Sequence, residues 1–210
     1  MPAVQLSVVL ITARTLLNDD AASNWTDAAL IPKAQQAHKE LQIKLRRAAA
    51  PVMKAFASPA TVSAGTTTFP SPPADLVAPI QLWETTVGGT ADTYALMTEA
   101  DPLPNAIAGT TLKWWAWIDE LINFIGASTN RQVLLSYWRA LAVPTSNTDS
   151  IGFTNGELYL APRTAALAAG SVGQAEEMKL LTALADNSLT EVILSNRGRA
   201  PQAAGASIKP

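Results

Sequence analysis

The 210-residue sequence contains no cysteine and a single histidine, His38. The absence of cysteine excludes disulfide bonds, thiolate nucleophiles and cysteine-based zinc sites, and one histidine excludes every metal site that needs several. No nucleophile-elbow, phosphate-loop, dinucleotide-binding or metalloprotease motif occurs either. We therefore expect no catalytic residue, no bound metal and no cofactor. We interpret His38 as a partly exposed helical residue and not as a general base.

Charge and long apolar runs are also scarce. Charged residues make up 15% of the chain, and 15 Lys+Arg against 17 Asp+Glu give a formal net charge of −2. This balance creates no field that would predict binding to nucleic acid or to a membrane surface. No stretch reaches the roughly 18 uninterrupted apolar residues of a membrane span, and the N-terminus lacks the basic start of a signal peptide. We expect a soluble protein that is not exported.

Much of the 48% hydrophobic content is small, because 38 residues are alanine. Apolar residues at helical spacing predict helices at both ends of the chain, over residues 6–17, from the cap Thr26 to about residue 50, over 157–169 and over 174–194.

Two helix boundaries depend on single residues. Pro32 lies too deep for a first helical turn, so we expect a short turn over residues 27–31 and a kink or restart at Pro32. We expect Gly170 to end the third helix.

The middle of the chain, from about residue 51 to 143, changes to short extended runs separated by turns. Runs of β-branched residues around Ala64 and Gly65 predict a small hairpin over residues 61–69. Further strands are expected over residues 76–86, 94–98, 112–118, 121–125 and 132–140.

These elements predict an α+β fold, in which a small antiparallel bundle of about four helices carries a β-rich insertion between its second and third helices. An extended C-terminal arm follows. The predicted segments are 1–50 and 146–195 for the bundle helices, 51–145 for the insertion and 196–210 for the arm.

The charge is polarised along the chain. Residues 51–110 carry five acidic groups and one basic group, whereas the arm is basic and has no acid. A chain that is neutral in sum but polarised locally is typical of a protein that docks against other proteins.

Adjacent acids are the first candidates for chemistry, because glycoside hydrolysis uses two carboxyl groups. Each pair also fits a structural role. Asp19 and Asp20 suit a loop between helices, and Asp119 and Glu120 suit a hairpin turn. Glu176 and Glu177 suit the first turn of a helix. A hydrolase that uses such a pair remains an alternative.

The second candidate is a basic cluster of Lys39, Lys44, Arg46 and Arg47. It could touch phosphates, but the solvated face of a helix explains it more simply. Within that helix, Glu40 and Lys44 have the spacing of a favourable ion pair.

Three tryptophans, Trp114, Trp115 and Trp117, form the most unusual local feature. Strand alternation would place Trp115 and Trp117 on one face, where they could stack on sugar rings. We favour packing in a core or at a subunit interface, where tryptophan is enriched. A tail-associated protein that binds carbohydrate or a receptor through these rings is the alternative function.

The order of the predicted parts resembles that of the head-to-tail adaptor (connector) proteins of tailed bacteriophages, over most of the chain. The stretch between the first two predicted helices resembles the family's loop there, and further similarities follow along the chain. The residues that carry the resemblance are Leu16, Leu17, Asn18, Asp19, Asp20, Trp25, Thr26, Asp27 and Leu30, then Pro73, Ala74, Asp75, Leu76, Ile80, Trp83, Glu84, Trp117, Gly126, Ala127 and Tyr137, and finally Arg163, Thr164, Ala165, Ala166, Asn196 and Arg197.

The resemblance implies a structural virion protein without enzymatic activity. It implies a ring of about a dozen copies beneath the portal, which extends the DNA channel and docks the next neck or tail component. The implied partners are the portal protein, a stopper, nozzle or tube protein and other copies of the chain, with DNA only as transiting cargo and no membrane. The implied location is the virion neck, after assembly in the host cytoplasm. Arm residues Arg197, Arg199, Gln202 and Lys209 would contact the portal.

Overall fold

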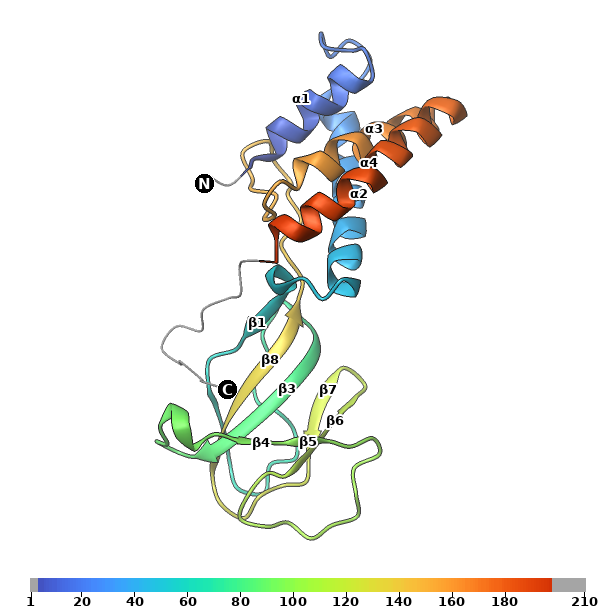
Figure 1. Ribbon diagram of the computed structural model, residues 1–210. Helices are drawn as coiled ribbons and strands as arrows, with labels where there is room; N and C mark the ends of the chain where they lie inside the picture. The colour runs from blue at the N-terminus through green and yellow to red at the C-terminus, as the bar shows by residue number, and fades with distance from the viewer. Residues whose placement is uncertain (1–3, 198–210) are drawn as a thin grey trace. The chain divides into compact units, whose positions relative to one another are not determined.

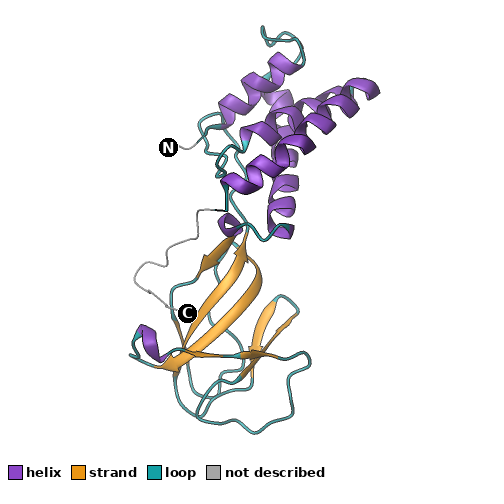
Figure 2. Cartoon of the chain, viewed as in Figure 1, coloured by secondary structure: helices purple, strands orange, loops and turns teal. Residues whose placement is uncertain are grey.

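The computed structural model describes residues 4–197, which fall into a helical unit and a β unit. The helical unit contains the described residues up to Met53 and from Leu141 onward, and the β unit contains residues 54–140. In the described chain, four α-helices belong to the first unit and both sheets belong to the second (Figure 2). The predicted α+β class, with a β-rich insertion between the second and third helices, is confirmed.

The helical unit is built around α3 (Glu157–Ser171). The helices α1 (Leu6–Leu16), α2 (Asp27–Arg47) and α4 (Ala175–Ser195) all pack against it (Figure 1). Because three helices cover α3, its side chains are short where the neighbours approach. The fully buried alanines of α3 are Ala161, Ala165, Ala166, Ala168 and Ala169.

Helix α2 runs without interruption through Pro32, so the predicted restart there is wrong. A proline at this position removes one hydrogen bond, to the carbonyl of Ala28 near the start of the helix. Leu30 and Ala34, on either side of Pro32, are fully buried. Their packing holds the segment helical despite the missing bond.

The sequence predicted that Gly170 ends α3, but the helix continues to Ser171. The chain turns at Gly173 instead, where φ is +82° and a side chain would be strained. A Cβ atom at Gly170 would lie 2.7 Å from Sδ of Met178. Gly170 therefore allows α3 and α4 to approach closely.

The larger sheet of the β unit centres on two long antiparallel strands, β3 (Leu76–Thr86) and β8 (Arg131–Arg139). The short strands β1 (Lys54–Phe56) and β2 (Ala60–Val62) both pair with β8, and β4 (Ala95–Leu96) pairs with β3. The short 3₁₀ helices η1 (Pro51–Met53) and η2 (Ala91–Thr93) precede β1 and β4.

The smaller sheet contains β5 (Thr98–Glu99), β6 (Trp114–Ile118) and β7 (Leu121–Phe124). Side chains from both sheets meet in one buried cluster, so the β unit has its own core. Its members are Ala55, Val62, Phe69, Leu82, Met97, Leu112, Trp115, Ile122, Phe124, Ala127, Val133, Leu135 and Tyr137.

The predicted hairpin over residues 61–69 is wrong, although the turn at Ala64 and Gly65 exists. Strand β2 pairs with β8, and Thr68 forms a bridge to Asn123 of β7. The two arms of the turn thus join different sheets, because Val62 and Phe69 are both buried in the core between them. The long strands and the turn at Asp119 and Glu120 are confirmed.

Within the described residues, no helix combines the length and the apolar character needed to cross a membrane.

Candidate functional site

The loop between α1 and α2 is organised by Asp19, which is buried. Its carboxylate accepts hydrogen bonds from the backbone N–H groups of Ser23, Asn24 and Trp25, at 3.0, 3.0 and 2.6 Å. Nε of Arg14 donates to the carbonyl oxygen of Trp25 at 2.7 Å. The bond from Trp25 is the main reason why the pKa of Asp19 is lowered. This acid therefore fixes a loop, as predicted for the pair it forms with Asp20.

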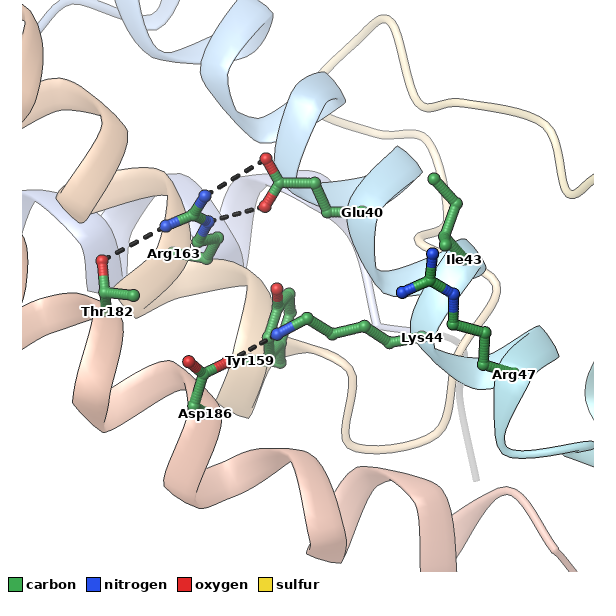
Figure 3. A pocket seen from close by; sticks show the side chains of 8 residues that line it. All are labelled: Glu40, Ile43, Lys44, Arg47, Tyr159, Arg163, Thr182 and Asp186. Carbon is green, nitrogen blue, oxygen red and sulfur yellow. Dashed lines mark hydrogen bonds and ion pairs between the residues drawn. The ribbon is translucent and has the colours of Figure 1, made fainter.

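A groove between α2, α3 and α4 gathers five charged side chains of the helical unit (Figure 3). Each helix contributes two residues that are four positions apart and therefore lie on one face. The groove has a volume of about 240 Å³, and Ile43 and Arg47 also line it. The paired residues are Glu40 and Lys44 of α2, Tyr159 and Arg163 of α3, and Thr182 and Asp186 of α4.

Four of the five charged groups in the groove are paired between helices. The guanidinium of Arg163 donates to both carboxylate oxygens of Glu40, from Nε at 2.6 Å and from Nη2 at 3.2 Å, and from Nη1 to Oγ1 of Thr182 at 3.2 Å. Nζ of Lys44 lies 2.5 Å from Oδ1 of Asp186 and 4.9 Å from the centre of the Tyr159 ring. These contacts join all three helices.

The pKa shifts in the groove follow from these pairs. Burial by itself would raise the pKa of Glu40, but the bonds and the charge of Arg163 outweigh it and lower that pKa. Burial also opposes the shift of Lys44, whose pKa is raised by its bond to Asp186. Burial raises the pKa of Tyr159.

These directions argue against acid–base chemistry in the groove. A catalytic carboxyl group at neutral pH needs a raised pKa, and a nucleophilic lysine needs a lowered one. Here the carboxylate and the ammonium are both fixed in their charged forms, and the phenol is fixed in its neutral form. The groove is an ion-pair network that holds three helices together.

His38 is fully buried, so its predicted partial exposure is wrong. Its Nε2 lies 3.0 Å from the carbonyl oxygen of Ile151, and its Nδ1 lies 3.1 Å from Nε2 of Gln42. A neutral imidazole that donates to the carbonyl and accepts from the amide satisfies both contacts. Burial lowers the pKa of His38, which keeps it in this neutral form.

The tryptophans of β6 lie mostly inside the β unit. Trp115 is 2% exposed within the core, Trp117 packs against this core, and Trp114 is half-buried. Two stacking rings would each need an accessible face, so Trp115 and Trp117 do not form a platform for sugars.

The end of the described chain contains one residue of the predicted portal-binding arm, Arg197, which is exposed. Arg199, Gln202 and Lys209 lie outside the described residues. Asn196 is fully buried, and its side chain binds the backbone of Thr154 through Oδ1 at 3.1 Å and Nδ2 at 2.9 Å. Asn196 thus packs with the helical unit.

The sequence did not reveal which charges pair. Glu40 and Lys44 were expected to pair with each other, but each one pairs with another helix instead. Arg163 follows Glu40 by 123 positions. The only sequence signal for these ion pairs was the four-residue spacing within each helix. This spacing shows that two residues share one face of a helix, but it does not show which residue of another helix each one pairs with.

Within the part of the chain that the structure describes, no three His, Cys, Asp or Glu side chains are grouped so that they could hold a metal ion. The fold and the groove define a structural component, because the paired side chains of the groove bind other parts of the same chain. Residues 5–205 match the family described as SU10 adaptor protein, and a search of curated proteins gave no match. Because the match covers nearly the whole chain, the protein belongs to the SU10 adaptor protein family and is a phage head-to-tail adaptor. Membership in a structural adaptor family implies no catalysis and implies binding to other virion proteins.

Proposed function

We propose that this adaptor forms a ring of about a dozen copies beneath the portal of the phage, extends the DNA channel and docks the next neck or tail component. The observation that carries the proposal is the family match over residues 5–205. The groove supports it, because helices tied together by ion pairs make a stiff subunit for a channel wall.

We further propose that the C-terminal arm contacts the portal through Arg197, Arg199, Gln202 and Lys209. Arg197 lies two positions after the last residue of α4, Ser195, and is exposed. The sequence from residue 197 to 210 contains three basic residues and no acid, so an acidic portal surface would attract it.

The ring is tested with the purified protein and its portal. Electron microscopy and native mass spectrometry of the mixture should show a closed ring of this chain on the portal. A portal that stays bare at every protein concentration would contradict the proposal.

The arm is tested by deleting residues 198–210, which leaves Asn196 and its bonds in place. We expect weaker portal binding and an unchanged unfolding midpoint, because this stretch has no apolar stripe. Arg197→Gln should weaken binding in the same direction, whereas Lys113→Gln, an exposed lysine of the β unit, should not. A truncated chain that still binds the portal as tightly as the full chain would exclude the arm as the contact.

A further inference from the structure

Helices α2 and α4 carry opposite net charge. Helix α2 has five basic and two acidic residues, a net charge of +3, and α4 has one basic and four acidic residues, a net charge of −3. Within one subunit, the described ion pair between these helices is that of Lys44 with Asp186. Among the described residues, four of the seven charged side chains of α2 and two of the five of α4 form no ion pair.

Four of these unpaired residues lie on two faces, which are exposed apart from the half-buried Glu177. The first, called the basic face, consists of Lys39, Ile43 and Arg47, which follow one another at four-residue spacing on α2. The second, called the acidic face, lies on α4 and consists of Glu177, Leu180, Leu184 and Glu191. In the described part of the chain, no ion pair is formed by Lys39, Arg47, Glu177 or Glu191.

Each face has an apolar centre between charges of one sign. On the basic face, Ile43 is 45% exposed, and on the acidic face Leu180 and Leu184 are 69% and 42% exposed. Apolar side chains at the centre and charges at the edge are the arrangement of a protein–protein contact surface.

The two faces cannot meet within one subunit. Thr182 and Asp186 of α4 line the groove that α4 shares with α2. Leu180 and Leu184 are each two positions from Thr182, which places them about 160° around the helix axis from it. The acidic face therefore points away from the α2 of its own chain.

We propose that the basic face of one copy packs against the acidic face of the next copy, and that this contact builds the ring. The inference rests on the proposed function and names the surfaces that join its subunits. Opposite charges and two apolar centres favour the contact, whereas pairing of two identical faces would place like charges opposite each other. A contact between two different faces does not form a two-fold dimer, and it builds a ring when the rotation from one subunit to the next closes.

The chain has no cysteine, so engineered cysteines report the contact without background. Ile43→Cys and Leu184→Cys are each introduced alone and together, in the full chain assembled on the portal, and are then oxidised. Either single variant should stay uncrosslinked. An equal mixture of the two should give covalent dimers, and the double variant should give a ladder of linked subunits.

Ile107→Cys with Leu184→Cys is the matched control pair, because Ile107 is an exposed apolar residue of the β unit. It should give no ladder. Covalent dimers from a single variant would show contact between identical faces and would overturn the inference.

Charge reversal gives a second test. Lys39→Glu with Arg47→Glu, or Glu177→Lys with Glu191→Lys, should weaken ring assembly by about tenfold or more, because like charges then face each other. All four changes in one chain make the faces complementary again and should restore assembly. Circular dichroism should show that every variant is folded.

The outcomes separate the two proposals. If the wild-type chain forms no ring on the portal, the proposed function fails and this inference fails with it. If wild-type rings form and both charge-reversed variants assemble equally well, the α2–α4 contact is excluded and the proposed function stands.

Discussion

At the scale of single residues, the β unit contains a buried ion pair between Glu84 of β3 and Arg131 of β8. Nε of Arg131 lies 2.5 Å from Oε2 of Glu84, and the two side chains are 10% and 6% exposed. A buried charge is tolerated because its partner is present, so the loss of either residue leaves the other without compensation.

Glu84→Gln should therefore lower the free energy of unfolding by about 3–5 kcal/mol. Urea denaturation measures this loss. Exposed Glu99→Gln, also in the β unit, should leave the midpoint nearly unchanged. Replacement of both partners, Glu84→Leu with Arg131→Leu, should cost less than Glu84→Gln alone. An equal or larger loss in the double variant would show that the pair has a role other than mutual compensation.

His38 predicts a pH dependence of stability. Its pKa is lowered in the folded protein, so the unfolded chain binds a proton first as the pH falls. The contribution of neutral His38 is complete above the ordinary histidine pKa of about 6.5 and should be lost progressively as the pH falls below it. The lowered pKa of Asp19 acts at lower pH.

Denaturation curves recorded across this range should show a falling free energy of unfolding for the wild type. His38→Gln, which keeps an amide donor for the carbonyl of Ile151 but does not titrate, should show a flatter dependence. Identical slopes for the two proteins would assign the pH dependence to other groups.

At the scale of elements, the turn between β6 and β7 carries a conformational strain. Asp119 and Glu120 both have positive φ angles, 51° and 60°. A two-residue turn of this kind favours glycine at its second position, because a side chain there is strained. Glu120→Gly should therefore raise the free energy of unfolding by about 0.5–1 kcal/mol.

Thermal unfolding measures this gain. Glu99→Gly in strand β5, where no positive φ angle requires glycine, is the control and should lower the midpoint. A lower midpoint for Glu120→Gly would mean that the Glu120 side chain stabilises the turn.

The elements that local spacing determines were predictable from the sequence, namely the helices and the long strands β3 and β8. The predictions that proved wrong did so because tertiary packing overrides the local sequence signal. Burial on both sides of Pro32 keeps α2 continuous, and the core between the sheets separates the two arms of the predicted hairpin. In the groove, the fact that Arg163 pairs with Glu40 depends on packing between helices that are distant in the sequence.

At the scale of the whole molecule, the net charge of −2 includes a basic helix, α2, and an acidic helix, α4, whose charges cancel. The charges of the separate sequence segments indicate an acidic insertion and a basic arm. The opposition of α2 and α4 becomes meaningful only when burial and pairing show which charges remain outward.

The β unit begins and ends on neighbouring strands, since Lys54 of β1 lies opposite Trp138 of β8. Opposite residues of an antiparallel pair are only about 5 Å apart. The insertion is therefore a cassette whose two ends already meet. During evolution, one such cassette could replace another of different length and chemistry without any change in the helices, and a designer could graft one in the same way.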